Sequence, residues 1–176
     1  MAGPSGTHAP RSALQSEAAV CATGLLQSEH PVVVLFSGGA DSACLLDLAV
    51  RIAGATFVHA LHVNYGLRPD AESDEELCRQ HCARLGDIPL AVVRPKTRPD
   101  GNVQAWARRQ RYDAAARIAA PMNAWVATGH TASDQAETVL YRLASAPGRR
   151  ALLGIKARDG KLVRPLLGLR RADTEA

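Results

Sequence analysis

Six consecutive residues, Ser37 to Ser42 (S-G-G-A-D-S), combine hydroxyls, glycines and a carboxylate directly after an apolar run. Gly38 and Gly39 permit unusual backbone angles and let a ligand approach the main chain closely. If a helix begins here, its free N–H groups and the hydroxyls of Ser37 and Ser42 favour an anion such as phosphate. The stretch therefore predicts a phosphate-binding loop.

Asp41 is the unexpected member of this loop, because a carboxylate repels a phosphate unless a cation lies between them. Mg²⁺ takes oxygen ligands and often bridges one or two carboxylates to substrate phosphates. We therefore predict a site for a magnesium nucleotide rather than for bare phosphate. The loop is not a Walker A sequence, since no Lys follows the glycines. A glycine turn capped by Asp and Ser is the structural alternative.

The elements around the loop alternate between strands and helices. Short apolar runs rich in β-branched residues predict strands at 32–36, 56–63, 90–93, 124–128 and 161–167. Helical patterns occupy 12–27, 42–53, 72–85, 103–119 and 133–144, and 147–159 reads as basic and irregular. This alternation predicts an α/β fold, a Rossmann-like open parallel sheet with helices on both faces. Ligands of such sheets bind beyond the carboxyl ends of the strands, where Ser37 to Ser42 lies.

The composition of the 176-residue chain limits its class. Residues 1–11 are rich in Gly, Pro and Ser and predict a disordered tail, and residues 12–176 predict one catalytic domain. The sequence has no apolar run long enough for a membrane span and no secretory signal. Its four cysteines form no C-x-x-C pair, which favours buried thiols in the cytoplasm.

Charge is distributed unevenly along the chain. Residues 1–88 hold five Lys and Arg against ten Asp and Glu, and residues 89–176 hold sixteen against seven. A basic half in a chain of net charge +4 predicts a polyanionic partner at that end.

Several sequence blocks resemble a known family. S-G-G-A-D-S, including Ala40, resembles the S-G-G-x-D-S loop of the PP-loop ATP pyrophosphatases. H-V-N-Y-G-L-R at 62–68, A-W-A-R-R-Q-R-Y at 105–112 and T-G-H-T-A-S-D-Q-A-E-T-V-L-Y-R-L at 128–143 resemble blocks of its tRNA(Ile)-lysidine synthetase branch. R-P-L-L at 164–167 matches a further block, so the resemblance runs from about residue 31 to 167.

This resemblance implies an enzyme that uses ATP and Mg²⁺. It places the metal on Asp41 and Asp134 and the catalytic roles on Asp41, Arg108 and Asp134. Arg108 and Arg111 are three residues apart, so they share one helix face, and arginine grips phosphate oxygens through two donors. Asp134 is also our candidate base for an incoming amine, with a plain helix-start acid as its alternative. The implied nucleotide-binding residues are Ser37, Gly38, Gly39, Ala40, Asp41, Ser42, His62, Arg111 and His130.

The implied reaction joins lysine to C2 of the wobble cytidine of tRNA(Ile) with a CAU anticodon. The RNA is first adenylated, and pyrophosphate and then AMP are released. The implied partners are that tRNA and free L-lysine, with a homodimer as an open alternative and the cytoplasm as the location. Two other readings stand beside it: another PP-loop tRNA-modifying enzyme such as a thiolase, and a nucleotide-binding RNA module with weak catalysis.

The sequence departs from the family pattern at three positions. Gln104 and Ser133 stand where the family usually has Glu and Asp, so one carboxylate is absent from each place, and Thr131 replaces a His. The final residues, R-R-A-D-T-E-A, resemble the start of a helix. We therefore expect the C-terminal regions of the family, which share in tRNA selection, to be missing from this sequence.

Overall fold

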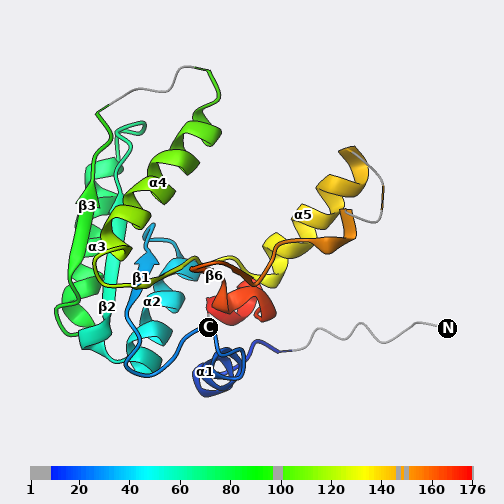
Figure 1. Ribbon diagram of the computed structural model, residues 1–176, viewed down its shortest axis with the longest axis horizontal. Coiled ribbons are helices and arrows are strands. Elements are labelled where there is room, and N and C mark those ends of the chain that lie inside the picture. The colour runs from blue at the N-terminus through cyan, green and yellow to red at the C-terminus, as the bar shows by residue number, and fades with distance from the viewer. Residues whose placement is uncertain (1–8, 97–100, 146–147, 149–150, 176) are drawn as a thin grey trace.

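The computed structural model describes residues 9–96, 101–145, 148 and 151–175. A six-stranded sheet carries the fold, in the order β3-β2-β1-β4-β6-β5 (Figure 1). The strands are β1 (Val32–Leu35), β2 (Val58–Val63), β3 (Leu90–Val93), β4 (Trp125–Ala127), β5 (Arg158–Asp159) and β6 (Leu162–Val163). β1 pairs in parallel with β2 and with β4, so the connections turn in opposite directions on its two sides. The carboxyl ends of β1 and β4 therefore form the switch point where open α/β sheets bind ligands.

Helices cover both faces of the sheet, which confirms the predicted fold class. On one face, Val32 and Val34 of β1 belong to the core that includes α1 (Ala13–Cys21), α2 (Ala40–Ala53) and α3 (Ala71–Arg84). On the other face, Val33 and Leu35 pack with alanines of α4 (Val103–Ala119). All four residues of β1 are buried, as expected for a strand covered on both sides.

Several boundaries differ from the predicted ones for local reasons. Helix α1 ends well before residue 27, because Gly24 adopts a φ of +65° that a helix does not allow. The predicted strand at 161–167 shrinks to β6, since Pro165 has no N–H to pair and begins the 3₁₀ helix η3 (Pro165–Gly168). The stretch predicted as irregular contains β5, which runs antiparallel to β6 at the sheet edge.

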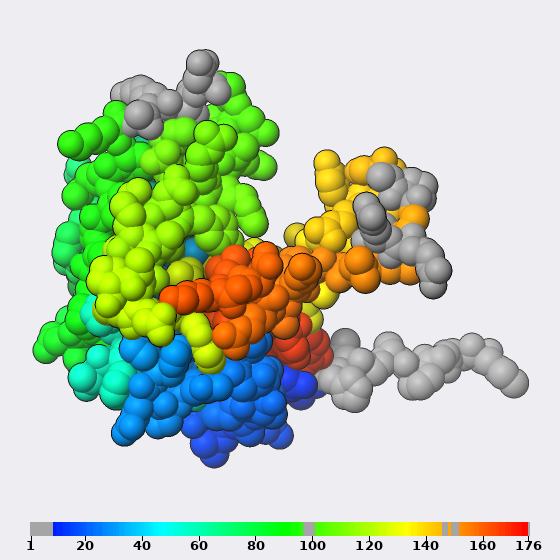
Figure 2. Space-filling view, viewed as in Figure 1, coloured from blue at the N-terminus to red at the C-terminus, as the bar shows by residue number. Residues whose placement is uncertain are grey.

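Helix α5 (Ala132–Ser145) projects away from the sheet, and none of its described residues is buried (Figures 1 and 2). The chain returns beside it through η2 (Ala151–Leu153). Gln135 joins the two limbs, because its amide nitrogen donates to the Ile155 carbonyl and its oxygen accepts from the Ile155 N–H. Residues 132–145 and 151–157 are called the arm below.

The last helix, α6 (Arg171–Thr174), is fastened to the beginning of the chain. The Arg11 N–H donates to the Asp173 carboxylate over 2.9 Å, and the Arg170 guanidinium donates to the Ala9 carbonyl over 3.0 Å. The domain was predicted to begin at Ser12, but Ala9 and Arg11 also contact it. Residues 1–8 of the predicted tail lie outside the described residues. Among the described residues, no helix combines the length and the apolar composition needed to cross a membrane.

Candidate active site

The loop between β1 and α2 closes on itself through one hydroxyl. Ser42 Oγ donates to the Gly39 carbonyl (2.9 Å) and accepts from the Ser37 N–H (3.2 Å). Gly38 has a φ of +86°, and a Cβ there would lie 3.3 Å from Cys78 Sγ, so this position requires glycine. Helix α2 begins at Ala40, which leaves the N–H groups of its first turn free for a ligand. The helix start predicted within this stretch is therefore confirmed.

A cavity of about 820 Å³ opens beside this loop, a volume suited to a nucleotide. Nine of the predicted site residues line it: Ser37, Gly39, Ala40, Asp41, Ser42, His62, Arg111, His130 and Asp134. Gly38 and Arg108 are not among its lining residues. Gly38 faces α3, and Arg108 lines a second cavity beside the arm.

The turn after β4 lies directly against the loop after β1. A Cβ on Gly129 would be 3.2 Å from the backbone carbon and oxygen of Asp41, closer than ordinary packing. Only a residue without a side chain allows this approach. The contact brings Asp41 and Asp134, more than ninety residues apart in the sequence, to the same edge of the sheet.

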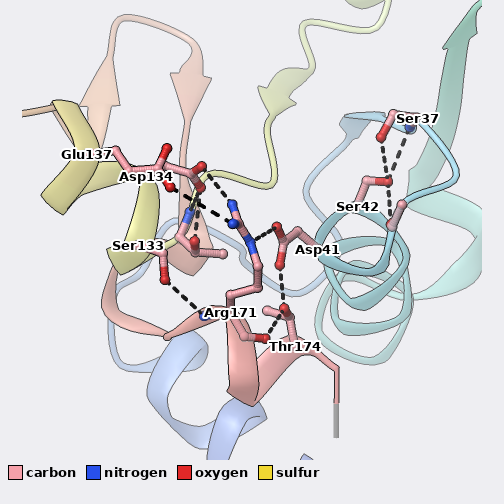
Figure 3. Close-up of polar contacts among 10 residues, drawn as sticks. Ser37, Asp41, Ser42, Ser133, Asp134, Glu137, Arg171 and Thr174 are labelled. Atoms are coloured by element: carbon pink, nitrogen blue, oxygen red, sulfur yellow. Dashed lines mark hydrogen bonds and ion pairs between the residues drawn. The ribbon is translucent and has the colours of Figure 1, made fainter. Parts of the chain in front are cut away.

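Arg171 of α6 lies between these two carboxylates (Figure 3). Its Nε donates to Asp41 Oδ2 over 3.5 Å, and its Nη2 donates to Asp134 Oδ1 over 3.2 Å. Glu137 lies further out, with Oε1 at 4.0 Å from Nη1, and Thr174 Oγ1 donates to the Asp41 carboxylate. The charges of Asp134 and then Asp41 raise the pKa of Arg171. The two predicted metal ligands thus face one cation of the protein itself.

Asp134 uses its two oxygens differently. Oδ2 accepts from the backbone N–H (2.7 Å) and the hydroxyl (2.9 Å) of Thr131, so it caps the first turn of α5. Oδ1 faces the cavity and Arg171. Both interpretations of this residue therefore have a structural basis, since one oxygen holds the helix start and the other faces the cavity, where Arg171 contacts it. Thr131, which replaces a family His, is fully buried in this cap.

The donor set fits Mg²⁺ bound together with a nucleotide. Two carboxylates already lie within reach of one cation, and Mg²⁺ commonly takes one or two carboxylates together with substrate phosphates and water. Among the described residues, no group of three or more His, Cys, Asp or Glu side chains could hold a metal ion by itself. The remaining ligands would come from the phosphates.

The two histidines lining the cavity have different surroundings. His62 is buried, and its Nδ1 donates to the Phe36 carbonyl over 3.0 Å, so it fixes the chain just before the loop. His130 Nδ1 lies 2.7 Å from Thr128 Oγ1. Burial, followed by the charge of Arg164, lowers the pKa of His130, with smaller effects of Arg108 and Arg111 and against the charge of Asp134. Burial and the neighbouring arginines therefore favour the uncharged form of His130.

Helix α4 supplies Arg111 to the first cavity and Arg108 to the second. The Arg108 guanidinium lies over the Tyr112 ring, 4.8 Å from its centre. The shared face predicted for these arginines thus serves two adjacent cavities. Gln104 is exposed and lines neither cavity. A carboxylate at this position would therefore lie outside both cavities.

A buried carboxylate, Glu75, which was not predicted from the sequence, lies beside the wall of the first cavity and is held by two exposed arginines and Asn64. Arg94 donates to both oxygens of Glu75 (2.7 and 2.8 Å), and Asn64 donates to one of them over 3.2 Å. Burial raises the pKa of Glu75, but hydrogen bonds from Arg79 and Asn64 and the charge of Arg94 outweigh it, and the pKa falls. Asn64 also accepts from the Gly66 N–H, which fixes the loop after β2.

Arg171 and Thr174 were also missed as site residues. Arg171 belongs to the basic half of the sequence, for which a polyanionic partner is predicted, but its side chain pairs with acidic residues of the site. The only local indication of these two residues was the helix start predicted near the end of the sequence, where the structure has α6. Nothing local indicates that this helix faces α2, since Thr174 and Asp41 are 133 residues apart.

Comparison with known proteins identifies the family of this chain. The PP-loop domain family matches residues 10–176. The chain is 39% identical over 143 residues to a tRNA(Ile)-lysidine synthase of Mycolicibacterium paratuberculosis, covering 81% of this chain and 43% of that protein. It is 41% identical to one of Nocardia farcinica, with 81% and 44% covered, and 40% identical to one of Pseudomonas fluorescens, with 81% and 34% covered. The chain thus spans less than half the length of these relatives.

Two solved structures share the fold at low sequence identity. The U34-tRNA thiolase NcsA of Methanococcus maripaludis superposes with a TM-score of 0.71 at 20% identity, covering 92% of this chain and 60% of that one. The NH3-dependent NAD synthetase of Campylobacter jejuni superposes with a TM-score of 0.62 at 17% identity, covering 93% and 71%. At these identities the likeness concerns the architecture alone.

Proposed function

Since this chain belongs to the PP-loop domain family, we propose that it activates an RNA carbonyl with ATP and joins lysine to it, as the catalytic part of a tRNA(Ile)-lysidine synthase. The main support is the pair of carboxylates, Asp41 and Asp134, that face one cation at a nucleotide-sized cavity. The similarity of the chain to lysidine synthases over 81% of its length also supports this proposal.

The reaction has two steps in this proposal. The C2 carbonyl oxygen of the wobble cytidine attacks the α-phosphorus of ATP, and pyrophosphate leaves. The ε-amine of lysine then attacks C2, and AMP leaves with the former carbonyl oxygen. The carbonyl oxygen becomes a good leaving group only after it carries AMP. A base in a single-stranded RNA loop reaches such a site at small cost.

The chain supplies groups for each part of this chemistry. The loop of Ser37–Ser42 would hold the phosphates of ATP through its N–H groups and hydroxyls. Arg111, on α4, would bind oxygens of the same phosphates. Mg²⁺, held by Asp41 and Asp134, would neutralise charge that develops on the phosphates when it is bound. Asp134 would accept the proton that the attacking amine loses, because its Oδ1 faces the cavity.

The finer assignments are part of the same proposal. The substrates are tRNA(Ile) with a CAU anticodon and free L-lysine, residues 12–176 form the catalytic domain, and the enzyme works in the cytoplasm. A homodimer stays a prediction.

The thiolase alternative is less well supported by the cysteines. Burial raises the pKa of Cys78 to about 12 and, with the charges of Asp47 and Asp41, the pKa of Cys44 to about 11. Thiols with such pKa values are poor nucleophiles and poor ligands at neutral pH, because the thiolate is the reactive form. Cys21 is exposed and stands outside both cavities.

Pyrophosphate release tests the proposal. Wild type is incubated with ATP, Mg²⁺ and the CAU-anticodon tRNA, with and without lysine, beside Asp41→Asn and the control Asp47→Asn. Asp47 lies on the same helix but forms a surface pair with Arg51. We expect tRNA-dependent release and a lysine-containing nucleoside from wild type and Asp47→Asn, and at least about a hundredfold loss in Asp41→Asn.

Other outcomes would contradict it. Release that ignores the tRNA and follows another acceptor leaves only the PP-loop class. Binding of ATP and tRNA without any release supports an RNA-binding module with weak catalysis.

A further inference from the structure

A second cavity, of about 670 Å³, lies between α4 and the arm. Figure 2 shows the molecule hollowed between these two parts. His130 and Asp134 line both this cavity and the first one, so the two adjoin at these side chains. The proposed function uses the first cavity for ATP and leaves the second without an occupant.

Arg164 is the buried cation of this second cavity. It is only 6% exposed, and its Nη1 donates to the Lys156 carbonyl over 2.6 Å. Its Nε is buried and has no hydrogen-bond partner among the residues that the structure describes. A guanidinium withdrawn from water is costly unless an anion compensates it. The carbonyl supplies one acceptor but no negative charge.

The acidic side chains of the same cavity are paired with other groups. Asp134 and Glu137 face Arg171, at 3.2 and 4.0 Å, and Asp159 lies 4.0 Å from Lys156. Two further arginines of the lining, Arg108 and Arg142, also have no acidic partner in the described part of the chain. Arg108 lies over the Tyr112 ring, and Arg142 donates to the Gly154 carbonyl over 2.7 Å. The cavity thus carries an excess of positive charge around a buried guanidinium.

We propose that the second cavity is an oxyanion subsite in which Arg164, assisted by Arg108 and Arg142, binds a carboxylate or phosphate group of the acceptor substrates. This inference rests on the proposed function for the identity of those substrates. Two groups have the required chemistry: the α-carboxylate of lysine, and an RNA phosphate beside the target cytidine. Either would bring its substrate next to Asp134, the proposed acceptor of the amine proton.

Binding to Arg164→Met tests the subsite, because methionine keeps an unbranched chain and removes the charge. Wild type, Arg164→Met and Arg164→Lys are saturated with Mg²⁺ and a non-hydrolysable ATP analogue to fill the first cavity. Affinities for inorganic phosphate, lysine and a CAU anticodon stem–loop are then measured by calorimetry. The matched control is Arg117→Met, on an exposed turn of α4 away from both cavities.

We expect Arg164→Met to weaken phosphate binding at least about tenfold, since charge-assisted hydrogen bonds are removed, and Arg164→Lys to retain part of it. The melting temperature of Arg164→Met should equal or exceed that of wild type, because this variant removes an uncompensated buried charge. Arg117→Met should bind phosphate as wild type does.

The other two probes identify the source of the anion. If lysine is the source, Arg164→Met binds lysine at least about tenfold more weakly but binds cadaverine, which lacks the carboxylate, as wild type does. If RNA is the source, stem–loop binding weakens by a similar factor while lysine binding is unchanged. Both results support the subsite.

Affinities of Arg164→Met and Arg164→Lys within about twofold of wild type for all three probes would overturn the subsite. Phosphate binding that depends on Arg164 without any binding of lysine or stem–loop by wild type would support the subsite and count against the proposed function. The two ideas can therefore fail separately.

Discussion

Asp41 and Asp134 are acceptable neighbours because Arg171 lies between them. Two carboxylates at one edge of the sheet repel each other, and the guanidinium contacts both at 3.5 and 3.2 Å. A bound divalent cation would occupy the same electrostatic position. Arg171 and the metal therefore compete for the same oxygens.

Removing Arg171 should strengthen metal binding in the absence of nucleotide. Arg171→Met leaves both carboxylates without their protein cation, so we expect Mn²⁺ affinity, followed by electron paramagnetic resonance, to rise about threefold to tenfold. Arg117→Met should bind Mn²⁺ as wild type does. Weaker Mn²⁺ binding by Arg171→Met would mean that the arginine orients the carboxylates for the metal rather than competing with it.

A second prediction for a single residue concerns the close contact of Gly129 with Asp41. Gly129→Ala places a methyl group about 3.2 Å from the backbone of Asp41, so the loop must shift. We expect the rate of pyrophosphate release to fall at least about tenfold, because misplacement of the loop disturbs the reacting geometry. The unfolding free energy should fall by about 1–3 kcal/mol in a urea titration.

Gly168→Ala is the matched control for Gly129→Ala, since no atom lies within 4 Å of its new methyl group. Gly168→Ala should change neither the rate of pyrophosphate release nor the unfolding free energy. Full activity of Gly129→Ala would show that the contact between the two loops does not position Asp41.

Local sequence was sufficient to predict the site residues of the loop Ser37–Ser42, but not to predict that Arg171 belongs to the site. Glycines, hydroxyls and a carboxylate within six positions form one turn, so their proximity follows from the sequence alone. Arg171 reaches Asp41 only because α6 folds against α2, a contact across 130 residues. No periodicity in the sequence specifies such a contact, and the charge count only placed Arg171 in the basic half, for which a polyanionic partner is predicted.

At the scale of elements, α6 depends on one buried acid. Asp173 accepts from the N–H groups of Arg11 and Arg170 and from the Arg170 guanidinium. The Arg170 hydrogen bond, with further hydrogen bonds from both backbones, lowers the pKa of Asp173 well below 3.8, although burial opposes this. Such a group stabilises the folded state above its unfolded pKa and ceases to do so as the pH falls toward its folded pKa.

Asp173→Asn should therefore lower the melting temperature at pH 7 by about 3–8 °C, measured by circular dichroism. The difference from wild type should begin to shrink as the pH falls below about 4, where the unfolded carboxyl becomes protonated. Asp113→Asn, at an exposed position of α4, should show neither effect. A difference that stays constant from about pH 7 to about pH 2 would show that packing, and not the charge of Asp173, fastens α6.

Most elements were predictable because their patterns are local. β3 and α4 occupy the predicted residues, and α2, α3 and α5 differ from prediction by one or two residues at an end. The antiparallel β5 was not predictable, because a two-residue strand exists only through its partner β6. The order of the strands likewise arises from long-range packing, although alternation alone predicted an open parallel sheet, to which β5 adds an antiparallel edge.

At the scale of the whole molecule, the basic half of the sequence supplies α4, the arm and the second cavity. The acidic half supplies α1, α2 and α3 on the other face of the sheet. An RNA that meets the second cavity therefore meets the basic side of the molecule.

Salt dependence of RNA binding should report this asymmetry. The double variant Arg109→Met/Lys156→Met removes two exposed cations of the basic half. We expect the slope of log affinity against log salt for a CAU anticodon stem–loop to become shallower by about one for each phosphate that the variant no longer neutralises. Arg51→Met/Arg84→Met, in the acidic half, should leave the slope unchanged. Equal slopes for all three proteins would place the RNA elsewhere.

The shared wall of the two cavities has a thermodynamic consequence. His130 and Asp134 face both spaces, so a ligand that reorients either side chain in one cavity alters the free energy of binding in the other. Such coupling is reciprocal: if ATP changes the affinity for the acceptor by some factor, the acceptor changes the affinity for ATP by the same factor. If ATP and the acceptor occupy the two cavities as proposed, this single pair of side chains would make each of them an effector of the other.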